Sequence, residues 1–254
     1  MRNIRTIFLA IGVFVLIFII AGFSTFYVLN SRNSARPEAL AALDSDDAIT
    51  VQQVEGQDWY VFSPTTTSVA AGFIIYPGGF VDPRAYAPLA RDIAAAGYQV
   101  VLVPMPLDLA VLDFGAADKV VSTFPDISSW AIGGHSLGGA MAAQYIGGNP
   151  AAMDGLALWA SYPAESTDLS PLSIQAVSIY GDADGVASME NVTDAASRLP
   201  PNTVFVPIPG GNHTQFGLYG EGLQRGDNPA GISREDQHAV VVESTIQMLD
   251  SIDR

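Results

Sequence analysis

The sequence predicts an α/β protein in which a mostly parallel sheet is flanked by helices. Short runs rich in β-branched and aromatic residues alternate with stretches of helical periodicity, which is typical of a parallel sheet covered on both faces. Most of these runs are apolar throughout, as expected of strands buried on both sides. With 254 residues, 49% of them hydrophobic, the chain can bury one sizeable core and carry an appendage.

The predicted elements begin near residue 59 and continue to the end of the chain. Gly97, Gly147 and Pro200 stand where helices should end. The expected strands are Trp59–Ser63, Phe73–Tyr76, Gln99–Val103, Trp130–Gly133, Leu156–Ala160, Val177–Tyr180 and Val204–Ile208. The expected helices are Tyr86–Ala96, Ala116–Phe124, Leu137–Gly147, Ser188–Leu199 and Ser233–Asp250.

The N-terminus predicts a single transmembrane helix. No charged residue occurs from Thr6 to Ser31, and Ile7–Leu29 is long enough to span a bilayer, which takes roughly 20 apolar residues. A cleaved signal peptide is the alternative, although its apolar region is usually only about 7 to 15 residues long. We expect residues 1–30 to form the anchor, 31–57 a linker and entry segment, and 58–254 the catalytic domain.

Charge and cysteine content exclude several kinds of function. Arg2, Arg5, Arg32 and Arg36 precede every acidic residue, which leaves seven basic against 26 acidic residues and a net charge of −19 beyond them. So acidic a surface disfavours nucleic acids. The absence of cysteine excludes disulfides, thiol nucleophiles and thiolate metal sites. Positive charges flank the apolar run almost equally, so we expect only a weak preference for a domain outside the cytoplasm.

The pentapeptide Gly134–Gly138 (GHSLG) has the pattern of a nucleophile elbow. It lies between an expected strand and an expected helix, which is the context that the G-x-S-x-G turn requires. Glycines at both ends permit a tight turn that exposes the Ser136 hydroxyl. The Leu137 N–H, at the start of the helix, would be one donor to an oxyanion. The alternative is a glycine-rich turn in which Ser136 only caps a helix.

Four segments together resemble the α/β-hydrolase superfamily, in particular its compact fold-5 branch, which is related to dienelactone hydrolases. The resemblance covers roughly residues 58–250 and implies an α/β-hydrolase fold with a serine nucleophile. The segments are Gly133–Gly139 (GGHSLGG), Tyr76–Asp82 (YPGGFVD), Leu156–Pro163 and Gly210–Gly217 (GGNHTQFG).

His213 is the expected catalytic base among the three histidines of the chain. It follows the last expected strand, and loops that leave the C-terminal ends of parallel strands carry the chemistry in such folds. His135 adjoins Ser136, where its ring should point away from the hydroxyl, and His238 lies in the expected C-terminal helix. We expect structural or solvated roles for both.

The acid that orients the base should lie between Ser136 and His213 in the sequence. The turn after the strand Val177–Tyr180 offers Asp182 and Asp184, and either could simply form the turn beside glycine. Resemblance to the family's Gly-x-x-Asp pattern favours Asp184. A calcium loop beginning at Asp182 is excluded, because it would require Gly and Glu where Ala187 and Thr193 stand.

The second oxyanion donor is expected after the strand Phe73–Tyr76, where glycines let the backbone approach a substrate. Gly79 and Phe80 remain alternatives, because Pro77 stands where many relatives have histidine and the register is open. Residues 161–173 are too few for a helical cap, and 218–232 form a long polar loop. Aromatic residues expected near the pocket are Phe80, Tyr162, Phe216 and Tyr219.

The motifs together predict a serine hydrolase that cleaves an ester or related acyl bond of a small substrate. Ser136, His213 and Asp184 would form its triad, and no metal or organic cofactor is required. Two alternatives remain: an acyltransferase that uses an acceptor other than water, and a membrane-tethered binding module that has lost activity.

Overall fold

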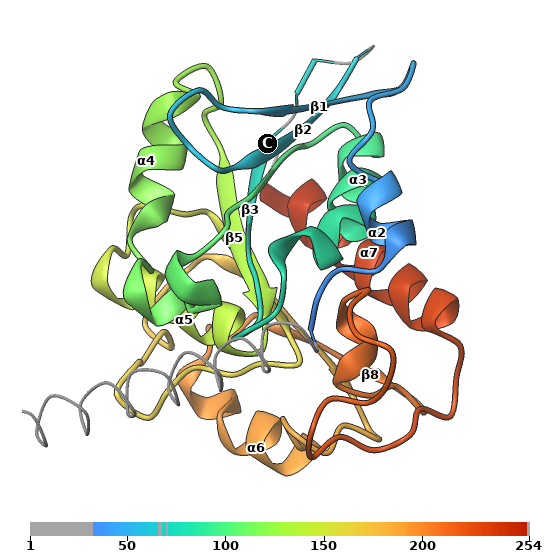
Figure 1. Ribbon diagram of the computed structural model, residues 1–254. Helices are drawn as coiled ribbons and strands as arrows, with labels where there is room; N and C mark the ends of the chain where they lie inside the picture. Colours follow the sequence, from blue (N-terminus) through green and yellow to red (C-terminus); the bar gives the residue numbers. More distant parts are fainter. Residues whose placement is uncertain (1–32, 66–67, 70, 253–254) are drawn as a thin grey trace, which may run out of the picture.

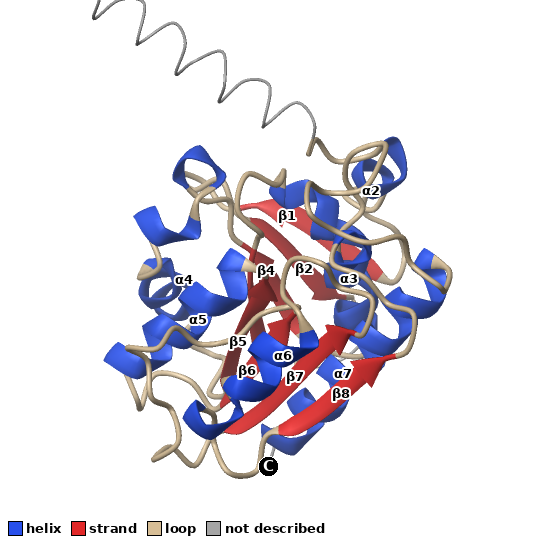
Figure 2. Ribbon diagram, turned by 90° about the horizontal axis from the view of Figure 1, so that it is seen from below, coloured by secondary structure: helices blue, strands red, loops and turns tan. Residues whose placement is uncertain are grey.

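A computed structural model describes residues 33–65, 68–69 and 71–252. The chain forms an eight-stranded sheet with the strand order β1-β2-β4-β3-β5-β6-β7-β8 (Figures 1 and 2). The β1–β2 and β2–β4 pairs are antiparallel, and all the remaining neighbours are parallel. The strands are β1 (Ile49–Gln53), β2 (Tyr60–Pro64), β3 (Gly72–Tyr76), β4 (Gln99–Leu102), β5 (Trp130–His135), β6 (Gly155–Trp159), β7 (Gln175–Gly181) and β8 (Val204–Ile208).

Helices cover both faces of this sheet. Helices α3 and α7 pack on one face, where Phe73 and Ile75 of β3 belong to their core; α4 and α5 pack on the other, against Ile74. Figure 2 shows the sheet between these two layers. The α-helices are α2 (Pro37–Ala41), α3 (Ala87–Ala95), α4 (Ala116–Thr123), α5 (Leu137–Gly148), α6 (Met189–Asp194) and α7 (Arg234–Ile252), and short 3-10 turns are η1 (Pro83–Tyr86), η2 (Pro106–Asp108), η3 (Ala110–Leu112), η4 (Ala196–Arg198) and η5 (Thr214–Phe216).

The central strands are buried on both faces, and this explains why the sequence reveals them. All five residues of β3 and of β6 are buried, so apolar side chains are required on both sides of each strand. The sheet starts earlier than the strands that the sequence predicts, because β1 lies inside the segment 31–57 expected to be a linker and entry segment. Only Ile49 of β1 is buried, and the following residues of this edge strand are polar or partly exposed.

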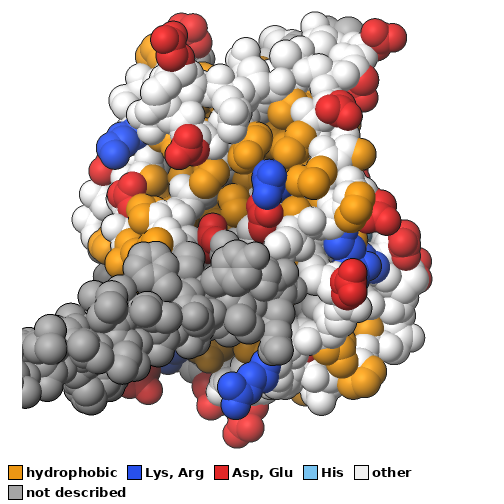
Figure 3. All heavy atoms as spheres, viewed as in Figure 1, with side chains coloured by type: hydrophobic (Ala, Val, Ile, Leu, Met, Phe, Trp, Pro, Cys, Tyr) orange, Lys and Arg blue, Asp and Glu red, His pale blue; other side chains and the backbone are white. Residues whose placement is uncertain are grey.

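The loops at the C-terminal edge of the parallel strands differ in length. Residues 160–174, between β6 and β7, contain no helix, and β8 is followed by a long connection to α7. In that connection Tyr219 forms an isolated bridge with Ala35, so the start of the described chain lies against it. The surface seen in Figure 3 carries more acidic than basic side chains, in keeping with the net charge of −15 for the chain.

The expected anchor, residues 1–30, lies outside the described residues. Within the described ranges, no helix has the length and apolar composition needed to cross a membrane.

Candidate active site

Ser136 occupies the turn between β5 and α5. Its backbone angles, φ 53° and ψ −120°, are ones that residues other than glycine adopt only when the surrounding structure holds them there. The Ser136 N–H donates to the carbonyl of Trp159 on β6 at 2.9 Å, and the Ser161 hydroxyl donates to the Ser136 carbonyl at 2.7 Å. The turn is therefore held by β6 and by the loop that follows it, and Ser136 itself is half-buried.

The glycines of this turn are required by the close approach of the loop after β3. A Cβ atom on Gly134 would lie 2.3 Å from the carbonyl oxygen of Tyr76, and one on Gly138 only 2.2 Å from the same oxygen. Neither distance is compatible with a side chain unless the backbone shifts. The motif thus has a structural reason in addition to a chemical one, since it lets the elbow pack directly on β3.

His213 and Asp184 meet in the loops that follow β8 and β7. The His213 Nδ1 atom is 2.8 Å from Asp184 Oδ2, and both side chains are fully buried. The other carboxylate oxygen accepts the N–H groups of Val186 and Ala187, each at 2.7 Å. Because a carboxylate oxygen accepts, Nδ1 is the donor in this bond, and in a neutral ring the lone pair would be on Nε2. That buried Nε2 has no hydrogen-bond partner within the described chain.

The imidazole of His213 lies beside the nucleophile elbow. Its ring centroid is 4.4 Å from that of His135, the residue immediately before Ser136. Strands β5 to β8 are consecutive neighbours in the sheet, so the loops that carry Ser136, Asp184 and His213 emerge along one edge. The structure therefore brings the three sequence-predicted residues to the same edge.

Asp182 has a different environment. Its exposed carboxylate accepts the Gly210 N–H at 2.6 Å and contacts no histidine among the described residues. Of the two aspartates that the sequence left open, only Asp184 contacts His213.

The two expected oxyanion donors lie close to each other. Leu137 is the first residue of α5, where N–H groups have no acceptor within the helix. A Cβ atom on Gly79 would lie 3.1 Å from Leu137 Cδ2, so the loop after β3 reaches the start of α5. The Phe80 N–H already donates to the Asp108 carbonyl at 2.8 Å. Of the two alternatives after β3, Gly79 is therefore better placed than Phe80.

Comparison with known proteins decides the family. A model of the alpha/beta hydrolase family matches residues 72–239, which include the elbow and the loops after β7 and β8. The chain belongs to the alpha/beta hydrolase family. The expectation drawn from the sequence motifs is thereby confirmed at the level of the superfamily, and family membership supports a hydrolase activity.

One solved structure illustrates the shared fold. The crystal structure of a predicted CIB-like hydrolase from Thermoplasma acidophilum aligns with a TM-score of 0.57 at 15% identity, covering 79% of this chain and 100% of that one. At this identity the likeness is one of fold. No curated protein matches the sequence.

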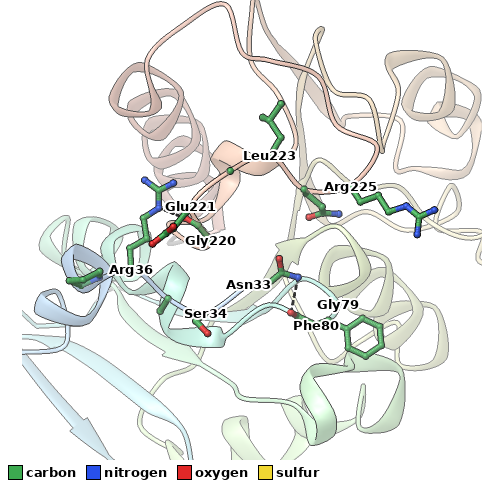
Figure 4. Close-up of a pocket in the computed structure, with 13 residues that line it drawn as sticks. Asn33, Ser34, Arg36, Gly79, Phe80, Gly220, Glu221, Leu223 and Arg225 are labelled. Carbon is green, nitrogen blue, oxygen red and sulfur yellow. Dashed lines mark hydrogen bonds between the residues drawn. The ribbon is translucent and has the colours of Figure 1, made fainter. Parts of the chain in front are cut away.

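A cavity of about 800 Å³ opens beside the loop after β3 (Figure 4). Gly79 and Phe80 lie on one side, the segment Asn33–Pro37 forms another wall, and Gly220–Arg225 close it from the loop before α7. The Asn33 side-chain amide donates to the Phe80 carbonyl at 3.0 Å, which ties the start of the described chain to the site. The volume of this cavity is typical of pockets that bind small molecules.

His135 is buried and links the elbow, through Tyr86, to the loop after β3. The Tyr86 hydroxyl accepts the Gly78 N–H at 3.1 Å and is hydrogen-bonded to His135 Nδ1 at 2.8 Å. Burial and the neighbouring His213 hold the pKa of His135 well below its usual value, so the ring remains neutral. The structural role expected for this residue agrees with its contacts, whereas nothing in the sequence indicated Tyr86 as its partner.

The structure also shows where the other residues that the sequence singled out lie. His238 contacts Asp92 on the surface between α7 and α3, at 2.7 Å. Phe216 is buried and stacks on the His135 ring, with a centroid distance of 5.6 Å. Tyr219 is buried and Tyr162 is half-buried. Of the four aromatic residues that were expected near the pocket, only Phe80 is among the residues that line the cavity. Among the described residues there is no group of three or more potential metal ligands.

Proposed function

We propose that the chain is a serine hydrolase that cleaves an ester or related acyl bond through an acyl-enzyme. The observation that carries the proposal is the fully buried pair of His213 and Asp184, whose imidazole lies beside the elbow that presents Ser136. A buried histidine with its Nδ1 proton held by a carboxylate has the tautomer that a general base needs.

In this mechanism the Ser136 Oγ attacks the carbonyl carbon of the substrate while His213 Nε2 takes its proton. The N–H groups of Leu137 and Gly79 stabilise the oxyanion, and Asp184 stabilises the imidazolium. When the intermediate collapses, His213 returns the proton to the departing alcohol or amine and the acyl group stays on Ser136. Water then attacks the acyl-enzyme with His213 again as base, which releases the acid and restores the serine.

Replacement of the nucleophile tests this function. We expect Ser136→Ala to reduce hydrolysis of p-nitrophenyl esters by the full chain by at least about 1,000-fold, because no acyl-enzyme can form. A fluorophosphonate probe should label Ser136 in the wild-type protein and nothing in the variant, as read by peptide mass spectrometry.

The matched control is Ser122→Ala, which removes an exposed hydroxyl that bonds only to the Lys119 carbonyl in α4. It should retain full activity. Full turnover by the folded Ser136→Ala protein would exclude the mechanism, and product that appears on an added alcohol in preference to water would indicate acyl transfer.

A further inference from the structure

The carboxylate of Asp227 contacts both loops that carry the proposed base and acid. One of its oxygens, Oδ1, accepts the N–H groups of Gly185 at 3.1 Å and of His213 at 3.2 Å. The same oxygen accepts the N–H of Asn228 at 2.9 Å. The second oxygen, Oδ2, accepts both the N–H and the hydroxyl of Thr214, at 2.8 and 2.6 Å.

These contacts join two separate connections of the sheet. Gly185 follows Asp184 in the loop after β7, and His213 lies in the loop after β8, so their backbones are fixed to one carboxylate from a third segment. Backbone bonds already join the two loops near their strands, where the Ala183 N–H donates to Gly211 at 2.9 Å. Asp227 adds the connection at the catalytic residues themselves.

The carboxylate is held as an anion by hydrogen-bond donors. Burial opposes its charge, but the donors on Thr214, Gly185 and His213 outweigh this effect and hold the pKa of Asp227 below its usual value. No cationic side chain forms a salt bridge with it within the described ranges. Every hydrogen bond that the Asp227 carboxylate accepts among the described residues therefore comes from the peptide backbone or from the Thr214 hydroxyl.

The same cluster continues to the wall of the cavity. The Thr214 hydroxyl also accepts the Gln224 N–H at 3.0 Å, and Gln224 lines the cavity beside Gly79 and Phe80. The Tyr219 hydroxyl in turn donates to the Gln224 side chain at 2.9 Å. The loop that lines this cavity is thus bonded to Thr214, the residue next to the proposed base.

We propose that Asp227 is a positioning residue that fixes His213 relative to Asp184 and Ser136. The inference rests on the proposed function for its catalytic meaning. One anion, bonded to the backbones of both loops, keeps His213 Nδ1 in contact with the Asp184 carboxylate. It also keeps His213 Nε2 pointing in a constant direction. Because small displacements of a catalytic base lower turnover steeply, loss of this anion affects rate more than substrate binding.

The test compares Asp227→Asn with Asp168→Asn in the full chain. Asparagine keeps the size of the side chain but replaces one carboxylate oxygen with an NH₂ group, which cannot accept a hydrogen bond. The N–H groups that face this position therefore lose their acceptor. Asp168 is exposed and contacts only Ser170 among the described residues, whose N–H it accepts at 2.9 Å. The two variants thus make the same chemical change in different places.

Two measurements are made on each variant: the separation of kcat from KM, and the ¹⁵N and ¹H spectrum of the histidine rings as a function of pH. The chain has three histidines, so the His213 signals can be assigned with a His213→Gln variant. For Asp227→Asn we expect kcat to fall about 10- to 100-fold with KM within about threefold, and the His213 ring signals and their titration to shift. Asp168→Asn should match the wild type in both measurements.

The proposal is overturned if Asp227→Asn has wild-type kcat and an unchanged His213 spectrum. It is equally overturned if kcat per folded molecule is unchanged and only the folded fraction decreases. Should Asp227→Asn not fold, Thr214→Val removes the hydroxyl bonded to Oδ2; it must lower kcat and shift the His213 signals, and Thr214→Ser must restore both. Failure of the proposed function is recognised separately, because Ser136→Ala would then keep its activity. The histidine ring spectrum reports on the position of His213 without any turnover.

Discussion

Asp182 and Asp184 lie two residues apart, yet their partners differ completely. The sequence alone leaves both open, since each follows the same strand and each suits a turn beside glycine. The decision depends on which carboxylate faces a histidine that is distant in the sequence, and only the packing of β7 beside β8 determines that. Family resemblance, which encodes such packing indirectly, favours the residue that the structure places against His213.

This difference predicts unequal effects of one substitution. We expect Asp184→Asn to lower kcat about 10³- to 10⁴-fold, because an amide can favour the wrong tautomer of His213. Asp182→Asn loses part of one exposed contact, to the Gly210 N–H, and should change kcat less than about threefold. Steady-state kinetics on an activated ester distinguishes them, and equal losses for both variants would contradict the assignment.

His135 predicts a pH dependence of stability. Its folded pKa is depressed by burial, whereas the unfolded chain has an ordinary histidine with a pKa near 6.5. Below about pH 6.5 the unfolded state therefore binds a proton that the folded state excludes, and stability falls as the pH falls. One such group contributes a slope of up to about 1.4 kcal/mol per pH unit.

Urea unfolding between neutral and mildly acidic pH measures this slope. In His135→Phe, which removes the titrating group and keeps a ring against Phe216, the free energy of unfolding should depend less steeply on pH than in the wild type. An unchanged slope would show that His135 does not remain neutral on folding.

Among the elements, the apolar pattern of a segment determines how well the sequence predicts the structure. Strands β3 to β8 and helices α3, α4, α5 and α7 lie within a few residues of the expected ranges, because apolar patterns mark them clearly. Strand β1 (ITVQQ) was not among the expected strands, because most of its residues are polar, whereas the other edge strand, β8 (VFVPI), is apolar although it also buries a single residue. Likewise the Asp227 contacts involve an ordinary polar loop, and no spacing in the sequence distinguishes that aspartate from its neighbours.

The contact between α5 and the loop after β3 predicts opposite effects of the same change within one helix. Gly138→Ala should lower the free energy of unfolding by about 1–3 kcal/mol or more and abolish hydrolysis, since its Cβ would overlap the Tyr76 carbonyl. Gly148→Ala, at the end of α5, has no atom within 4 Å of the new Cβ and should be neutral or slightly stabilising. Thermal melts of both variants test this; similar losses would refute the close packing.

For the whole molecule, we propose that residues 7–29 anchor the chain in a membrane, with the acidic domain outside the cytoplasm. The uncharged run of the sequence and its length support this proposal. The full chain should remain in the membrane pellet after alkaline carbonate extraction and keep its N-terminus. A variant with Leu16→Arg and Ile19→Asp should be released, because each charge at the centre of a span costs about 2.5–3.5 kcal/mol. A mature protein that begins after Leu29 would identify a cleaved signal peptide.

The hydrogen bond between Asn33 and Phe80 limits how far the folded domain can lie from a membrane anchor in the preceding residues. Four peptide units separate Leu29 from Asn33 and span at most about 14 Å even when fully extended. A chain anchored through the apolar run would therefore keep Asn33, which lines the cavity beside Gly79 and Phe80, within that distance of the bilayer surface. Acyl compounds dissolved in the bilayer would then lie close to this cavity, whatever their solubility in water.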